Sequence, residues 1–200
     1  MVTLKQLINR FNFLDEKQFV NHDCIRRKIR RDPLTGKIPA IYVSGNFRDA
    51  HNIFACISAS EQKRNKPIAY QIERRNGTAK RFLDFICNMI ATQWLRHDKV
   101  LIMDNAAIHV GKESRVVKDL LWETVIDGIP LRILVVYLPP RCPELNPIEK
   151  IFHILSKRVQ RFKETETTEH AEILKVVTNI MDNLCFELIK ITICSCNYSI

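Results

Sequence analysis

The chain has 200 residues, with 31 Lys and Arg against 22 Asp and Glu, and a formal net charge of +9. This length is enough for one domain with a full hydrophobic core and small additions. The sequence contains no secretory signal and no apolar run long enough to span a bilayer, so we expect no membrane contact and an intracellular protein. The positive charge favours an anionic partner, nucleic acid above all.

The seven cysteines are scattered, and no two of them have the CxxC spacing of a zinc or redox motif. We interpret them as reduced thiols in an intracellular protein, not as a disulfide framework. A metal site at the terminal Cys-Ser-Cys is the alternative, although structural zinc needs four ligands. The cysteines are Cys24, Cys56, Cys87, Cys142, Cys185, Cys194 and Cys196.

The first predicted strand lies within residues 9–19, where Phe11 and Phe13 alternate with polar residues. Asp15, followed by Glu16, is the first candidate for a functional carboxylate. Asp23 and Asp32 are the alternative candidates for that carboxylate. The structural interpretation is that Asp15 is a solvated surface acid with no function.

A strongly basic segment follows between residues 21 and 39, with a turn at Asp32-Pro33. Three interpretations stay open: contact with a phosphate backbone, a nuclear import signal, or a solvated hairpin edge. The charged residues that carry the first interpretation are Arg26, Arg27, Lys28, Arg30 and Arg31, with Lys37 beside them.

The middle of the chain alternates between strand and helix patterns. Thr78 is a candidate N-cap for an amphipathic helix that we expect to reach about Arg96. Strands are predicted at 38–47, 52–60, 68–72, 99–104 and 131–138, and helices at 78–96, 113–126, 146–159 and 168–190. Antiparallel strands followed by alternating helices and strands predict an α/β fold with a mixed central sheet flanked by helices.

Residues 131–138 are almost wholly apolar, which predicts a strand buried on both faces of the sheet. Pro139 and Pro140 end it. Asn146 is a good N-cap for the next helix, and Glu149 falls on its first turn, in the pattern of a capping box. Glu149 is therefore either a capping residue or a functional acid.

Asp104 ends the apolar run VLIM, and an acid there is often only the residue that starts a turn. If Asp15 and Asp104 end neighbouring strands, and Glu149 lies at the start of the helix after the last strand, all three lie at one end of the sheet. Three close carboxylates repel unless a cation neutralises them, and hard oxygen ligands suit Mg²⁺ or Mn²⁺.

The segments DNAAIH and LPPRCPELNPIEKIF together resemble the DDE superfamily of transposases and endonucleases, in the branch of mariner-like elements and bacterial insertion sequences. The match is sharp from Val100 onward, and Phe152 replaces the usual Trp of that family. The matched positions are Asp104, Asn105, His109, Leu138, Pro139, Pro140, Pro143, Leu145, Asn146, Pro147, Ile148, Glu149 and Phe152.

The resemblance implies a ribonuclease-H-like catalytic domain over residues 1–165, with a helical extension over 166–200. Asp15, Asp104 and Glu149 are expected to be the catalytic metal ligands for Mg²⁺ or Mn²⁺, with two ions about 4 Å apart. Asn105, His109 and Asn146 are expected in supporting roles. Lys157 and Arg158, with the basic segment, are expected to contact DNA.

By the same resemblance, the expected reaction is nicking at transposon ends followed by strand transfer, in a homodimer or higher synaptic assembly. We expect a nuclear location in a eukaryote, and the cytoplasm or nucleoid in a bacterium. Family members carry an N-terminal helix-turn-helix reader, and none is visible here. A domesticated or decayed copy that binds nucleic acid without cutting it is therefore the alternative function. A phosphatase is disfavoured, because no glycine stands in a phosphate-loop pattern.

Overall fold

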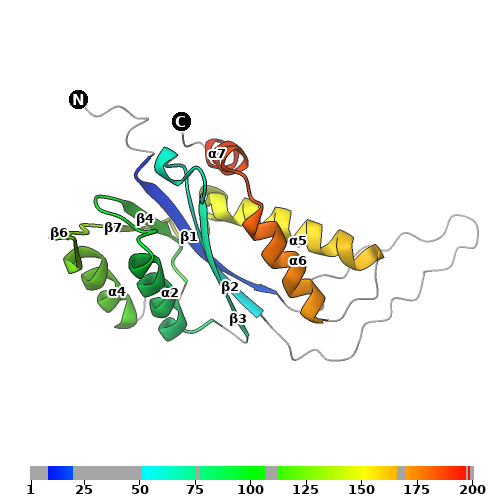
Figure 1. Cartoon of the computed structure of the whole chain (residues 1–200), viewed down its shortest axis with the longest axis horizontal. Helices are drawn as coiled ribbons and strands as arrows, with labels where there is room; N and C mark the ends of the chain where they lie inside the picture. Colours follow the sequence, from blue (N-terminus) through cyan, green and yellow to red (C-terminus); the bar gives the residue numbers. More distant parts are fainter. Residues whose placement is uncertain are drawn as a thin grey trace, which may run out of the picture.

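The computed structural model describes residues 9–19, 51–74, 77–106, 112–165, 170–196 and 198. Within them, a five-stranded sheet has the order β3-β2-β1-β4-β7 (Figure 1). β2 is antiparallel to β1 and β3, whereas β4 is parallel to β1 and β7 is parallel to β4. The predicted mixed sheet is confirmed. Its strands are β1 (Phe11–Phe19), β2 (His51–Ser58), β3 (Ile68–Arg74), β4 (Val100–Met103) and β7 (Leu134–Tyr137).

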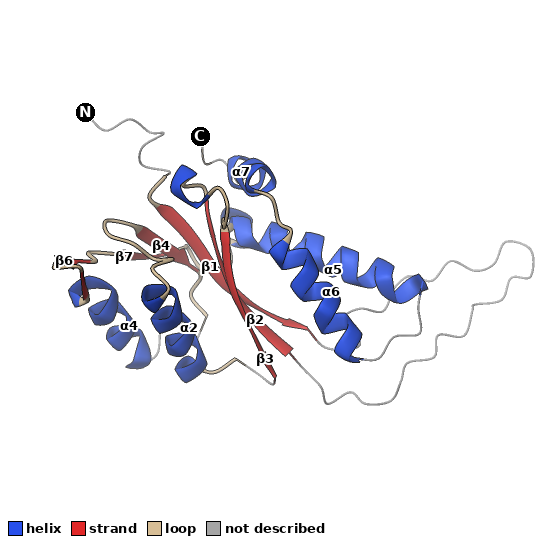
Figure 2. Ribbon diagram, in the orientation of Figure 1, coloured by secondary structure: helices blue, strands red, loops and turns tan. Residues whose placement is uncertain are grey.

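Helices cover the sheet from both sides (Figure 2). α2 (Ala79–Ala91) and α4 (Lys112–Glu123) lie on one face, and α5 (Pro147–Thr165), α6 (His170–Asp182) and α7 (Phe186–Cys194) lie on the other. Two short helices, η2 (Glu61–Lys63) and η3 (Pro143–Leu145), and a hairpin of β5 (Val125–Ile126) and β6 (Ile129–Pro130) complete the described elements.

The alternation of side chains along β1 divides the core into two layers. Phe13 packs into the cluster beneath α5, together with Ile102 and Phe152. Leu14, the next residue, points to the opposite cluster beneath α2 and α4. β1 is therefore covered on both faces, and a polar residue within it must find its partner inside the protein.

Asn12 is such a residue in β1, and its Nδ2 finds partners whereas its buried Oδ1 has none. Its side chain is fully buried, and Nδ2 donates to the backbone oxygens of Arg10, at 3.3 Å, and Val100, at 3.5 Å. These contacts link β1 to the start of β4. The strand predicted over 9–19 is thus confirmed despite its polar composition.

β7 differs from the prediction for residues 131–138, which expected a strand buried on both faces. Leu134 is 54% exposed and Val136 is 38% exposed, so one face of β7 is open to solvent. The reason is its place at the edge of the sheet, beyond the region that α5 covers. A near-continuous apolar run does not distinguish a central strand from such an edge strand.

The helix predicted over 168–190 is two helices. The first helix, α6, ends at Asp182, and the second, α7, begins at Phe186. Between them, Cys185 has the extended conformation of a residue preceding a helix (φ −80°, ψ 150°). The break turns α7 back toward α5, where Lys150 Nζ donates to the backbone oxygen of Ser195 at 2.8 Å. Apolar periodicity continues through the break, so the sequence pattern concealed it.

Helices α2 and α4 are shorter than the predicted helices over 78–96 and 113–126. α2 starts after Thr78, whose side chain accepts from the Arg81 N–H at 3.3 Å, as the predicted cap requires. It ends at Ala91, before Gln93 takes a positive φ of 53°. α4 ends at Glu123, because the chain then forms the β5–β6 hairpin. The apolar periodicity of residues 113–126 predicts that Val116 and Val125 face inward, but they are 52% and 58% exposed.

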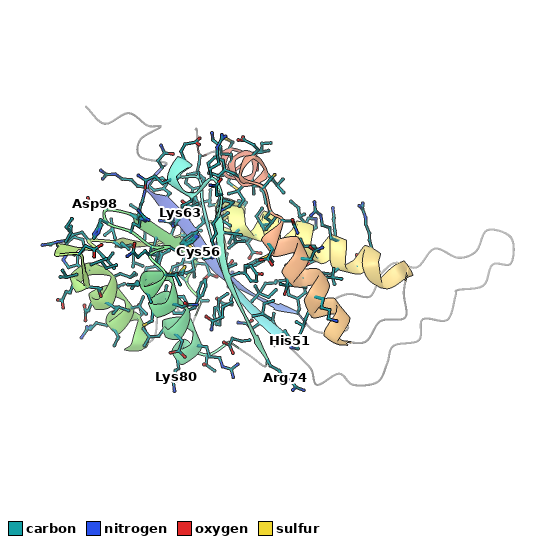
Figure 3. The ribbon with its side chains drawn as sticks, viewed as in Figure 1. His51, Cys56, Lys63, Arg74, Lys80 and Asp98 are labelled. Atoms are coloured by element: carbon teal, nitrogen blue, oxygen red, sulfur yellow. The ribbon has the colours of Figure 1, made fainter. Side chains whose placement is uncertain are left out.

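Lys63 is a buried amine at the end of η2, and it lies close to Cys56 of β2 (Figure 3). Its Nζ donates to the backbone oxygen of Trp94 and lies 3.1 Å from the centroid of the Trp94 ring. Burial lowers the pKa of Lys63 to about 7 and raises the pKa of Cys56 to about 12. The contact secures the segment that follows α2.

Several predictions fall outside the described residues: the strand over 38–47, the basic segment from Arg26 to Arg31, and His109. Six cysteines lie within the described part of the chain, and all six are free thiols, as predicted. No helix in that part is long and apolar enough to cross a membrane.

Phe152 is 1% exposed and fully enclosed in the cluster beneath α5. We expect Phe152→Trp to lower the free energy of unfolding by about 1–3 kcal/mol, because a larger ring must displace its neighbours. Urea unfolding followed by circular dichroism measures the change. Val116→Trp, at an exposed position of α4, is the control, with an expected change within about 0.5 kcal/mol. A Phe152→Trp variant as stable as the wild type would show that the core has spare room.

Candidate active site

Asp15 was expected to end its strand, but it lies in the middle of the central strand β1, with only 4% of its surface exposed. It points to the same side as Phe13, toward the beginning of α5. Its Oδ1 accepts from the Glu16 N–H at 2.8 Å, and its Oδ2 accepts from Asn146 Nδ2 at 3.3 Å. A nearly inaccessible carboxylate in a central strand is costly to bury, so its surroundings decide what it can do.

Asp104 directly follows β4, and the register places it level with Asp15. Phe13 pairs with Ile102, and each acid stands two residues beyond its member of that pair. Asp104 Oδ1 accepts from the Ala106 N–H at 3.0 Å, so Asp104 does start a turn, as one interpretation of the sequence expected. Because β4 ends beside the middle of β1, the turn also holds Asp104 next to Asp15.

Asn105 anchors the same turn to the neighbouring strand. Its Nδ2 donates to the backbone oxygen of Leu138, just past β7, at 2.5 Å. The end of β4 is thereby fixed against the beginning of the two-proline segment that leads to α5. This contact shows that Asn105 holds the turn after β4, and its predicted supporting role in catalysis stays a prediction.

Glu149 stands on the first turn of α5 and is half-buried. The capping box considered for it is absent. The N–H of Asn146 donates to the backbone oxygen of Pro143 at 2.9 Å, so it is not used by the Glu149 carboxylate. The side chain of Asn146 reaches Asp15 and does not cap α5. Glu149 therefore does not act as a capping residue, which was the structural interpretation of its position in the sequence.

Three neighbouring acids act on the pKa of Asp15. It is raised from 3.8 to about 8, first by burial and then by the negative charges of Glu149, Asp104 and Glu16. The hydrogen bond from the Glu16 N–H opposes the rise. Asp104 and Glu149, which are far from Asp15 in sequence, thus act on its buried carboxylate, and no positively charged residue in the described part of the chain lowers its pKa.

The carboxylates converge without forming a finished metal-binding geometry. In the described part of the chain, no group of three or more His, Cys, Asp or Glu side chains is arranged to hold a metal ion as it stands. The chemistry of the donors nevertheless fits a hard divalent cation, because they are oxygen atoms with excess negative charge. Asn146 Oδ1, which is buried and has no hydrogen-bond partner, adds a neutral oxygen beside them.

Only some of the residues predicted to contact DNA lie in the described part of the chain. Lys157 and Arg158 are exposed on α5, about 12–14 Å along the helix axis from Glu149 at 1.5 Å per residue. His109 and the segment from Arg26 to Arg31 lie outside the described residues. The sequence placed Asn146 among the supporting residues but did not reveal its contact with Asp15, because the two are 131 residues apart.

A mixed sheet of this order, with one acid inside the central strand, one directly after the parallel strand beside it and one on the first turn of the helix after the last strand, defines a ribonuclease-H-like domain. The model of the DDE superfamily endonuclease family matches residues 10–171, and the chain belongs to that family. No curated protein sequence matches the chain.

Solved structures of similar fold include several of the Mos1 mariner transposase. The pre-cleavage Mos1 transpososome superposes with a TM-score of 0.64 at 16% identity, covering 94% of this chain and 53% of that one. The Mos1 paired-end complex with Mn gives 0.65 at 14% identity, with the same coverage. The isolated Mos1 catalytic domain gives 0.60 at 14% identity, covering 94% and 78%. The chain thus spans about half the length of the Mos1 chains in the two complexes.

The raised pKa of Asp15 predicts how the metal-free protein responds to pH. Since the folded state keeps a proton on Asp15 up to about pH 8 and the unfolded state loses it near 3.8, this residue's contribution to stability falls as the pH rises between these values. We expect Asp15→Asn to stabilise the protein in EDTA at pH 8.5 by on the order of a few kcal/mol, with little difference at pH 4.

Urea unfolding of the wild type and the variant at both pH values measures this difference. Comparing the two proteins cancels other titrations, including that of Lys63, whose lowered pKa makes stability rise with pH above about 7. A difference between wild type and variant that does not change with pH would contradict the raised pKa of Asp15.

Proposed function

We propose that this chain is the catalytic domain of a transposase, which cuts DNA and transfers the cut strand with the help of divalent cations. The observation that carries the proposal is the convergence of Glu149 and Asp104 on the buried carboxylate of Asp15. Membership of the DDE superfamily endonuclease family supports the same reaction class.

Asp15, Asp104 and Glu149 are the proposed metal ligands. Mg²⁺ or Mn²⁺, as two ions, would supply Lewis-acid activation of a water or 3′-hydroxyl and stabilise the leaving oxygen. The residues of the chain contribute position: β1 and β4 hold the two aspartates level, and α5 brings Glu149 against them. Solved Mos1 complexes with Mn and with Mg support the choice of ion.

DNA is the proposed partner, both as transposon ends and as target. Mos1 structures include a paired-end complex with the left transposon end and a strand transfer complex, which supports this substrate and a paired, synaptic assembly. The net charge of +9 favours association with phosphate backbones. The protein would act where its DNA lies, in the nucleus of a eukaryote or the cytoplasm or nucleoid of a bacterium.

The first test is Mn²⁺-dependent nicking of supercoiled DNA. We expect Asp104→Ala and Glu149→Ala each to lower the nicking rate by on the order of 100-fold or more, because each change removes a proposed ligand of the ion. The exposed Asp119 and Glu144 provide matched controls, and their alanine variants should retain the wild-type rate.

Nicking that survives Asp104→Ala or Glu149→Ala would contradict the metal-ligand role. A wild-type chain that binds DNA and does not nick it with either ion would instead identify the alternative function, a decayed or domesticated copy that binds nucleic acid without catalysis.

The second test concerns Lys157 and Arg158, the exposed basic pair of α5. Reversing both charges, Lys157→Glu with Arg158→Glu, should weaken DNA binding and reduce the slope of log K against log salt by about two, one for each lost phosphate contact. Lys80→Glu with Arg115→Glu, on the helices of the opposite sheet face, is the matched control.

Fluorescence anisotropy with labelled duplex DNA at several salt concentrations measures this slope. If the two double variants lose affinity equally, the effect is one of net charge and α5 has no special contact. The segment from Arg26 to Arg31 is a further proposed contact, and the same measurement on its charge-reversed variant tests it.

A further inference from the structure

The side chain of Asn146 has an unusual direction for a residue that precedes a helix. Asparagine at this position normally accepts a hydrogen bond from the first turn through Oδ1. Here Nδ2 donates to Asp15 Oδ2 at 3.3 Å, and the backbone N–H is already bonded to the carbonyl of Pro143. The carboxamide therefore turns away from α5 and toward the central strand β1.

This direction is energetically unfavourable unless Asn146 has another partner. Oδ1 accepts no hydrogen bond, although the residue is only 1% exposed. An unsatisfied buried acceptor destabilises the fold, and a side-chain cap that is not made leaves the helix terminus less stable. Helix stability alone does not explain this arrangement, so the side chain is placed for its contact with Asp15.

The two hydrogen bonds to Asp15 leave it able to bind a cation. The Glu16 N–H occupies one lone pair of Oδ1, and Asn146 Nδ2 occupies one lone pair of Oδ2. Each oxygen of the deprotonated carboxylate has about two acceptor sites, so each keeps one for a metal ion once the proton has left. Two donors from different elements fix the plane of the carboxylate, and one of those elements is the segment that begins the helix of Glu149.

We propose that Asn146 is a positioning residue of the divalent-cation site, which fixes the Asp15 carboxylate through Nδ2 and presents Oδ1 to the coordination shell of the ion. The inference rests on the proposed function, since it assumes that the carboxylates bind a divalent cation. Asn146 joins β1 to the start of α5, and so it keeps Asp15 and Glu149 in register. Its neutral oxygen adds a donor to the site without adding a fifth negative charge to Asp15, Glu16, Asp104 and Glu149.

The test compares Asn146→Ser with the wild type, using the full chain. Serine is as good an N-cap as asparagine, but its side chain is too short to keep the contact with Asp15. A residue that only caps the helix would therefore tolerate this change. We expect the Ser variant to bind Mn²⁺ about 10–100-fold more weakly, as for other residues that orient metal ligands. Its melting temperature in EDTA should stay within about 3 °C of the wild type.

Titration of Mn²⁺ without DNA, followed by the electron paramagnetic resonance signal of the free ion, gives the affinity independently of nicking. Asn88→Ser, at an exposed position of α2 on the opposite face of the sheet, is the matched control and should bind Mn²⁺ like the wild type. Asn146→Thr, which also caps and fills more of the buried space, is measured in parallel in case the Ser variant does not fold.

Asp104→Ala separates failure of this inference from failure of the proposed function. If it abolishes Mn²⁺ binding while the folded Asn146 variants keep wild-type affinity, the role of Asn146 is overturned and the metal site stands. If Asp104→Ala leaves Mn²⁺ affinity unchanged, or the wild type binds no Mn²⁺, the proposed function fails and the inference fails with it.

Discussion

The burial of the Asp15 carboxylate is the constraint on which the rest of the site depends. A carboxylate in the middle of a covered strand loses most of its hydration, and the negative charges of Glu149, Asp104 and Glu16 raise its pKa further, to about 8. Two hydrogen-bond donors, the Glu16 N–H and Asn146 Nδ2, offset part of this cost. The fold holds the group in place because β1 is fixed on both sides by β2 and β4.

The sheet and α5 divide the task of bringing the acids together. The parallel register of β1 and β4 sets Asp15 and Asp104 level with each other, and the contact of Asn105 with the end of β7 holds the intervening turn. α5 then crosses the face of β1 with Phe152 packed in the core beneath it. Apolar packing thus positions the helix, and the acid on its first turn is carried to the site by that packing.

The sequence predicted the parts of the molecule that depend on local chemistry. The Thr78 cap, the strand ending at Asp104 and the helix bearing Glu149 each rest on neighbouring residues, and each was found. The open face of β7 and the break after Asp182 were not predicted, because apolar residues appear in the same pattern at an edge and across a break. Asn146 was predicted as a cap since its true partner, Asp15, is distant in sequence.

α5 is a single uninterrupted helix from Pro147 to Thr165, with Glu149 near its beginning and Arg158 farther along. A helix of this kind moves nearly as a rigid rod, so a tilt of about 5° over the roughly 13 Å between these residues displaces one end by about 1 Å relative to the other. Displacements of that size are enough to change reaction rates by orders of magnitude. A partner that tilted α5 through Lys157 and Arg158 would therefore displace Glu149 as well, because one uninterrupted helix carries all three residues.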